Sequence, residues 1–200
     1  MIKKIGICIF IGLICLVGVF LLGRENQEKG QAFQGWKMAM KARAYISNEA
    51  LHYSGRYYEG GYPEENVGVC TDVVWNAFFG ADIDLKKLVD ADIARNPIAY
   101  EAVVTKPDPN IDFRRVRVLE VFFQRNAESL TTDYNDIFAW MPGDIVTFES
   151  KHIAIVSGLR NIWGRPYIIQ HGRDPAAEED RIFASDGMEI SGHYRWPLQP

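Results

Sequence analysis

The stretch PGDIVTFESKHIAIVSG, residues 142–158, is where the chain changes from helical to extended character. A Pro-Gly-Asp turn is followed by two short β-branched runs, residues 145–148 and 153–157, with a polar turn between them. Further extended runs follow at residues 167–170 and, more weakly, at 193–196. Short strands joined by turns predict an antiparallel sheet in the second half of the chain.

The first half of the chain has helical spacing instead. Apolar residues recur about once per helical turn in four segments, at residues 36–51, 70–78, 85–93 and 116–123. Residues 53–68, between the first two segments, contain four Tyr, four Gly and one Pro, which predicts a long exposed loop. Helices first and strands afterwards, without βαβ alternation, predict an α+β fold with N-terminal helices packed on a C-terminal antiparallel sheet.

Composition and charge exclude several classes of protein. The chain has 200 residues, 48% of them hydrophobic and 24% charged, so it can bury a sizeable core as one domain and is neither disordered nor fibrous. The net charge is -4, and no run of Lys or Arg lies outside the N-terminus. The broad basic surface of a nucleic-acid-binding protein is therefore not expected.

The N-terminus predicts a membrane segment. Lys3 and Lys4 precede Ile5 to Leu22, a run without charge or proline that is long enough to span a bilayer. Leu21-Leu22-Gly23-Arg24 is a poor cleavage site, so an uncleaved signal anchor is favoured over a cleaved signal that would leave the protein secreted. The two lysines place the domain on the extracytoplasmic side. The chain is accordingly divided into an anchor at residues 1–23, a polar tether at 24–34 and a folded domain at 35–200.

Cys70 is the first chemical candidate. It is the only cysteine of the exported part, because Cys8 and Cys15 lie in the predicted anchor. In the first turn of a predicted helix, its thiol faces the positive end of the macrodipole, which favours a nucleophilic thiolate. The N–H groups of that turn could also serve as an oxyanion hole. The alternative is that Cys70 packs as a small hydrophobe in register with Val73 and Val74.

Two histidines lie at strand ends. His152 begins the predicted strand after the polar turn, and His171 ends the next one. Alternation places His171 on one face of its strand and Gln170 on the other. If the two strands are neighbours, His171 could orient His152 and complete a set of nucleophile, base and orienter. The alternative is that each histidine is a polar strand end facing water; His52 and His193 have no comparable setting, which favours structural roles for both.

Other catalytic motifs do not occur in the sequence. It contains no Gly-x-Ser-x-Gly, no phosphate-binding glycine-rich loop, no His-Glu-x-x-His and no Cys-x-x-Cys. Residues 108–112 begin like a calcium loop, but Phe113 stands where glycine is needed and Leu119 where glutamate is needed. We therefore expect neither a metal nor an organic cofactor.

Five segments, taken in order, resemble a known bacterial family of domains of unknown function, number 1287: GVCTDVV at residues 68–74, NIDFRRV at 110–116, PGDIVT at 142–147, HIAIVS at 152–157 and HYRW at 193–196. The family itself resembles the papain-like NlpC/CHAP amidases and peptidases of the bacterial cell wall. The resemblance covers residues 36–196 and implies a papain-like fold, with Cys70 as nucleophile, His152 as general base and His171 as the third polar residue.

Four further residues are candidates for substrate binding. Asp72 could bind a substrate amine or stabilise the helix N-terminus. Arg114 and Arg115 could hold a carboxylate or lie on a solvated helix face. Tyr62 lies in the tyrosine-rich loop, which could contact substrate.

The sequence therefore predicts an extracytoplasmic cysteine amidase or peptidase that cleaves an amide in peptidoglycan or a related envelope peptide. The competing interpretation is a non-catalytic envelope-binding module, in which Cys70 is buried and structural and the tyrosine-rich loop binds glycan or a partner. The sequence does not indicate an oligomeric state.

Overall fold

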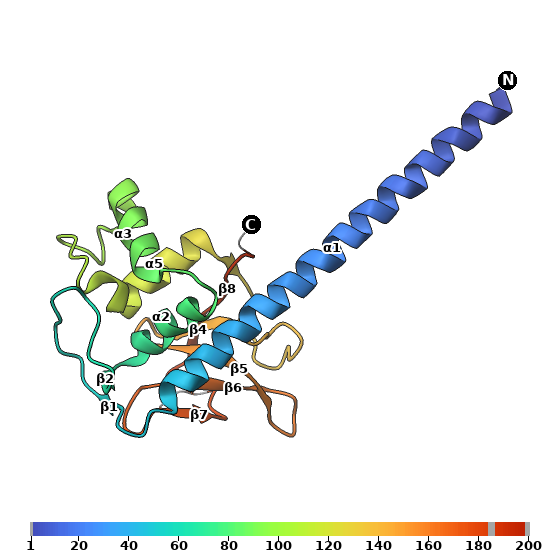
Figure 1. Ribbon diagram of the computed structural model, residues 1–200. Helices are drawn as coiled ribbons and strands as arrows, with labels where there is room; N and C mark the ends of the chain where they lie inside the picture. Colours follow the sequence, from blue (N-terminus) through green and yellow to red (C-terminus); the bar gives the residue numbers. More distant parts are fainter. Residues whose placement is uncertain (1, 184–186, 199–200) are drawn as a thin grey trace.

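The computed structural model describes residues 2–183 and 187–198, with side chains described from residue 22 onward (Figure 1). The helices, in chain order, are α1 (Ile2–Ile46), α2 (Cys70–Gly80), α3 (Leu85–Arg95), α4 (Pro97–Tyr100), the 3-10 helix η1 (Asp112–Arg114) and α5 (Val116–Asn126). The strands are β1 (His52–Tyr53), β2 (Val67–Gly68), β3 (Glu128–Ser129), β4 (Ile145–Phe148), β5 (His152–Arg160), β6 (Pro166–Gln170), β7 (Ala177–Glu179) and β8 (Ile190–Arg195).

The main sheet has the strand order β3-β8-β4-β5-β6-β7, and all of its neighbouring strands are antiparallel. This confirms the predicted α+β class and the antiparallel sheet in the second half of the chain. The ends of the predicted loop at residues 53–68 come together as a short parallel pair, with Tyr53 opposite Gly68 in β1 and β2. This pair places Tyr53 opposite Gly68, which precedes Cys70 by two residues in the chain.

The two faces of the sheet are covered differently. Ile153, Ile155 and Ile169 belong to the core that the sheet shares with α2, α3 and α5, and Cys70 belongs to the same core. Ala154 and Ile168 point to the other face, where they pack around the buried Trp140 in a second core. Figure 1 shows α2 and the C-terminal half of α1 on one face of the sheet. Strand alternation therefore decides which side chains of β5 and β6 lie on the α2 side.

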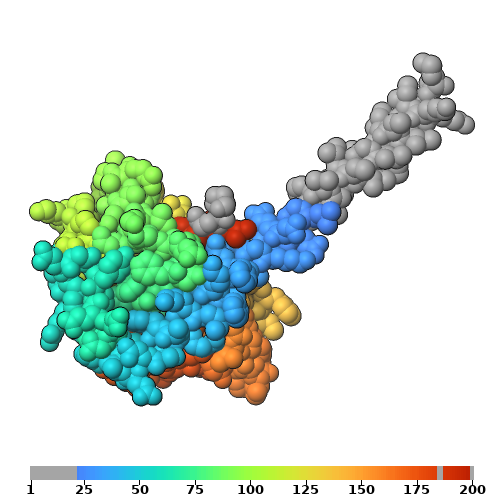
Figure 2. Space-filling view, in the orientation of Figure 1, coloured from blue at the N-terminus to red at the C-terminus, as the bar shows by residue number. Residues whose placement is uncertain are grey.

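The Pro-Gly-Asp turn is the point at which α1 meets the sheet. Gly143 has a positive φ of 86°, and a Cβ at this position would overlap the backbone of Gly35 in α1. Met38, Ala39 and Ala42 continue the buried face of α1. Figure 2 shows the C-terminal half of α1 packed closely against the domain.

The predicted tether, residues 24–34, is helical and forms one continuous helix, α1, with the part that packs on the domain. The predicted anchor at residues 1–23 lies, up to residue 21, outside the residues whose side chains are described. Among the residues whose side chains are described, from 22 onward, no helix has the length and apolar character needed to cross a bilayer.

Candidate active site around Cys70

Helix α2 begins at Cys70 because Asp72 caps it. Val69 is in extended conformation, with φ -139° and ψ -178°, and its N–H donates to Asp72 Oδ2 at 2.8 Å. A carboxylate two residues after the first helical position satisfies a backbone donor and complements the helix dipole. This capping interaction fixes the place where the chain leaves β2 and presents the thiol.

Asp72 also forms a buried ion pair with Arg114. The guanidinium donates to both carboxylate oxygens, at 2.7 Å from Nε and 2.8 Å from Nη2, and the indole N–H of Trp75 donates to the same carboxylate at 2.7 Å. The side chains of Asp72 and Arg114 are 0% and 1% exposed. The two side chains neutralise each other inside the core, so the prediction that they bind substrate does not agree with this geometry. Of the two roles considered for Asp72, only stabilisation of the helix N-terminus agrees with it.

The Cys70 side chain is buried, and its burial favours the protonated form of the thiol. Burial raises the pKa of Cys70 to about 11, and the charge of Asp72 adds to this effect. The backbone N–H groups of Ile153, Thr71 and Cys70 itself act in the opposite direction, as the helix N-terminus was expected to do, but they are outweighed. This shift of the pKa runs against the predicted resting thiolate.

The contact with Ile153 places the thiol at the start of β5. The N–H of Ile153 points at the sulfur of Cys70, and His152 is the preceding residue and the first of the strand. His152 Nε2 lies 2.6 Å from Oε1 of Gln170 on the neighbouring strand β6. Gly172 leaves room for the ring, since a Cβ there would stand 3.2 Å from His152 Cε1. Cys70 thus lies at the start of β5, in contact with the residue that follows His152, and Gln170 holds the imidazole of His152.

His171 does not occupy the predicted place beside His152. The strands are neighbours, as expected, but His171 shares the α2 face with Ile169, whereas Gln170 points to the His152 side. The hydrogen bond that the structure describes for the His152 ring is the one with Gln170. Alternation along β6 already separates His171 from Gln170 in the sequence, and only the histidine was predicted as an orienter.

His171 has different partners. Its Nε2 lies 3.3 Å from Oδ1 of Asp174, and the same oxygen accepts the N–H of Tyr53 at 2.7 Å. The Tyr53 ring stands edge-on to the imidazole, with centroids 5.4 Å apart. Burial raises the pKa of Tyr53, and the charges of Cys70 and Asp72 raise it further.

The other two predicted substrate-binding residues, Arg115 and Tyr62, contact residues outside the surroundings of Cys70. Arg115 is half exposed and pairs with Asp112 at 3.0 Å. Tyr62 packs edge-on against Trp75 and Phe113 and remains 37% exposed. Neither contact includes Cys70.

The remaining histidines are separate from the thiol. His52 is exposed in β1. His193 is buried, with Nδ1 2.7 Å from the carbonyl oxygen of Thr131 and Nε2 3.0 Å from Asp144, and it stacks on Trp140 at 3.6 Å. Asp144 is also held by Arg195 through both carboxylate oxygens. This network fixes the Pro-Gly-Asp turn to β8.

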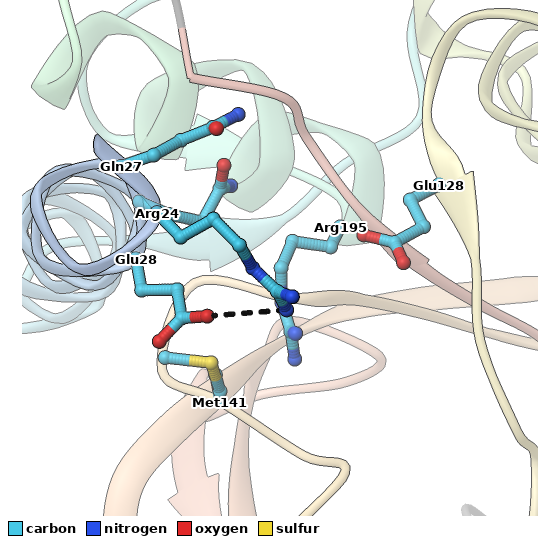
Figure 3. Close-up of a pocket in the computed structure, with 7 residues that line it drawn as sticks. Arg24, Gln27, Glu28, Glu128, Met141 and Arg195 are labelled. Atoms are coloured by element: carbon cyan, nitrogen blue, oxygen red, sulfur yellow. Dashed lines mark ion pairs between the residues drawn. The ribbon is translucent and has the colours of Figure 1, made fainter. Parts of the chain in front are cut away.

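A hollow of about 540 Å³ lies where α1 passes β3 and β8, away from the thiol (Figure 3). Its lining mixes two arginines with two glutamates, and one arginine and one glutamate of α1, Arg24 and Glu28, approach to 3.8 Å. Arg195 in its wall is already paired with Asp144. The hollow therefore presents no group that is prepared for catalysis.

Comparison with known proteins identifies relatives without an assigned activity. The profile of the family described as "Domain of unknown function (DUF1287)" matches residues 39–196. The chain is 35% identical over 176 residues to the uncharacterized protein YijF of Escherichia coli (strain K12), with 83% of each chain covered. No solved structure matches the chain.

Proposed function

The chain belongs to the DUF1287 family, and we propose that it is a thiol hydrolase in which Cys70 attacks an amide and His152 is the general base. One observation carries the proposal: the Ile153 N–H contacts the Cys70 sulfur, and the residue that precedes Ile153 is a histidine held by Gln170. We further propose a papain-like arrangement, because a thiol at a helix N-terminus, a histidine at a strand start and an amide on the next strand occur in that order.

The protonated thiol determines how the reaction would begin. Because the pKa of Cys70 is raised to about 11, the resting site holds S–H, and the proton must leave as the sulfur attacks the substrate carbonyl. The Gln170 oxygen can only accept, so the Nε2 of His152 carries the hydrogen, and the proposal assigns the thiol proton to Nδ1.

The later steps follow from the same residues. The carbon–sulfur bond forms, His152 returns the proton to the departing amine as the carbon–nitrogen bond breaks, and water then hydrolyses the thioester. The N–H groups of Cys70 and Thr71 at the start of α2 are suited to stabilise the negative oxygen of the tetrahedral intermediate. No step requires a cofactor.

The substrate and location are proposed from the sequence. The apolar run between Lys4 and Arg24 supports an anchored, extracytoplasmic domain, and an amide in peptidoglycan or a related envelope peptide is the substrate available there.

One observation favours a second candidate function. Cys70 is only 7% exposed, as a packing cysteine would be. In that case the protein is a non-catalytic envelope-binding module, and the tyrosine-rich loop at residues 53–68 contacts glycan or a partner.

Digestion of muropeptides separates the two candidates. The full chain in detergent is incubated with muropeptides, and new amine termini are measured beside Cys70→Ala, His152→Ala and, as a matched control, the exposed His52→Ala. We expect amine release by the wild type and by His52→Ala only. Release by Cys70→Ala at the wild-type rate, or by none of the proteins, would favour the binding module.

A further inference from the structure

His171 has an unsatisfied nitrogen inside the protein. The residue is 0% exposed, and its Nδ1 has no hydrogen-bond partner within the part of the chain that the structure describes. Buried polar atoms are nearly always paired, because leaving one unpaired loses the hydrogen bond that it had with water. An unpaired nitrogen beside a candidate active site therefore points to a ligand that pairs with it.

The surroundings of the ring determine what Nδ1 can bind. Nε2 faces the carboxylate of Asp174, which only accepts hydrogen bonds, so Nε2 carries a hydrogen. In a neutral ring, Nδ1 is then a bare acceptor. Nδ1 is thus prepared to accept a hydrogen bond from an N–H group.

His171 lies on the same side of the sheet as Cys70. Ile155 pairs with Ile169, and continuing this register toward the start of β5 places His171 opposite Ile153, whose N–H contacts the sulfur. Tyr53 links the two sites from outside, because it contacts the His171 ring and pairs with Gly68, two residues before Cys70.

We propose that His171 is a substrate-binding residue of the Cys70 site, and that its Nδ1 accepts a hydrogen bond from a peptide N–H of the substrate. This inference rests on the proposed function, since it gives that site a peptide as substrate. Asp174 and Tyr53 act as positioning residues: Asp174 fixes the tautomer of the ring, and the backbone of Tyr53 holds Asp174 through the shared oxygen.

Imidazole nitrogen NMR tests the inference without any turnover. The full-length Cys70→Ala protein, with labelled histidine, is titrated with muropeptides released from peptidoglycan by a muramidase, and the His171 signals are assigned with His171→Asn. We expect an unprotonated Nδ1 in the free protein and an upfield shift of its signal as muropeptide binds. A protonated Nδ1 in the free protein, or an Nδ1 signal that muropeptides leave unchanged, overturns the proposal.

Kinetics provide the second readout. His171→Asn keeps an acceptor oxygen, so its KM should stay within about threefold of wild type, whereas His171→Leu should raise KM by about tenfold or more at nearly unchanged kcat. Circular dichroism establishes that both variants fold. An unchanged KM in a folded His171→Leu also overturns the proposal. Absence of turnover in the wild type, with the NMR shift present, overturns the hydrolase alone and leaves the binding role of His171 supported.

Discussion

Replacing Arg114 with methionine removes the guanidinium that neutralises a fully buried carboxylate. Asp72 would lose two hydrogen bonds, of 2.7 and 2.8 Å, and keep only those from Trp75 and Val69. Breaking a buried ion pair by removing one partner costs about 3–5 kcal/mol of unfolding free energy. For a chain of this size, each kcal/mol corresponds to about 2–4 °C in Tm, so we expect Arg114→Met to lower Tm by about 6–20 °C.

Thermal unfolding of the full chain in detergent, followed by far-UV circular dichroism, measures this loss. Lys37→Met is the matched control, because it breaks an ion pair with the 90% exposed Asp82 and should cost no more than about 1 kcal/mol. In the double variant Asp72→Leu/Arg114→Met both charges are removed, so its loss should fall short of the sum of the single losses by about 1–3 kcal/mol. If Arg114→Met melts with the control, the pair does not stabilise the start of α2, and Arg114 is again a candidate for substrate binding.

Three further predictions concern the thiol, its base and the Pro-Gly-Asp turn. Alkylation of Cys70 by iodoacetamide should be slow at pH 7 and become faster until about pH 11, and a rate that levels off near pH 8 would contradict the raised pKa. Because the folded protein binds the thiol proton more tightly than the unfolded chain, the free energy of unfolding should fall as pH rises through that range. His152→Ala should lower kcat for amine release by about 10²- to 10⁴-fold, and Gln170→Ala by less, since Gln170 only positions the base; an effect confined to KM would count against both roles. Gly143→Ala should have a lower Tm than Gly187→Ala, because both glycines have positive φ but only a Cβ on Gly143 would overlap helix α1. Equal Tm values would show that α1 does not pack as described.

The fold class could be predicted from the sequence because it depends on local periodicity. The β-branched runs after Gly143 and the helical spacing before it are properties of neighbouring residues, and the structure confirms both. The pair β1–β2 could not be predicted in this way, because two-residue strands have no period and their partners are separated by a loop. The strands β3 and β7, of two and three residues, escaped prediction for the same reason.

The candidate site was predictable in its members more than in its chemistry. Cys70 and His152 were proposed from their predicted positions at the start of a helix and of a strand; the structure confirms both positions and brings the two starts together, while the catalytic roles stay predictions. Gln170 was not predicted as the partner of His152, because glutamine has no titratable group and is not a typical catalytic residue. Alternation nevertheless places Gln170 on the face of β6 opposite to His171. Burial of the thiol depends on β5 and β6, which lie about 80 or more residues later in the chain, so no local pattern could indicate it.

In the proposed mechanism, burial of Cys70 changes what the site requires of its base. In a site with a resting thiolate, the helix N-terminus has already separated the proton from the sulfur, and loss of the histidine removes only part of the activation. Here the N–H groups of Cys70, Thr71 and Ile153 lower the pKa of the thiol without overcoming burial, so the sulfur stays neutral until a base accepts its proton. These same N–H groups then remain available for the charge that develops during attack, first on sulfur and then on the carbonyl oxygen. It follows that the pH dependence of kcat should report the protonation of His152, and that raising the pH toward the pKa of Cys70 should partly rescue His152→Ala, whereas it should not rescue a variant that lacks the thiol.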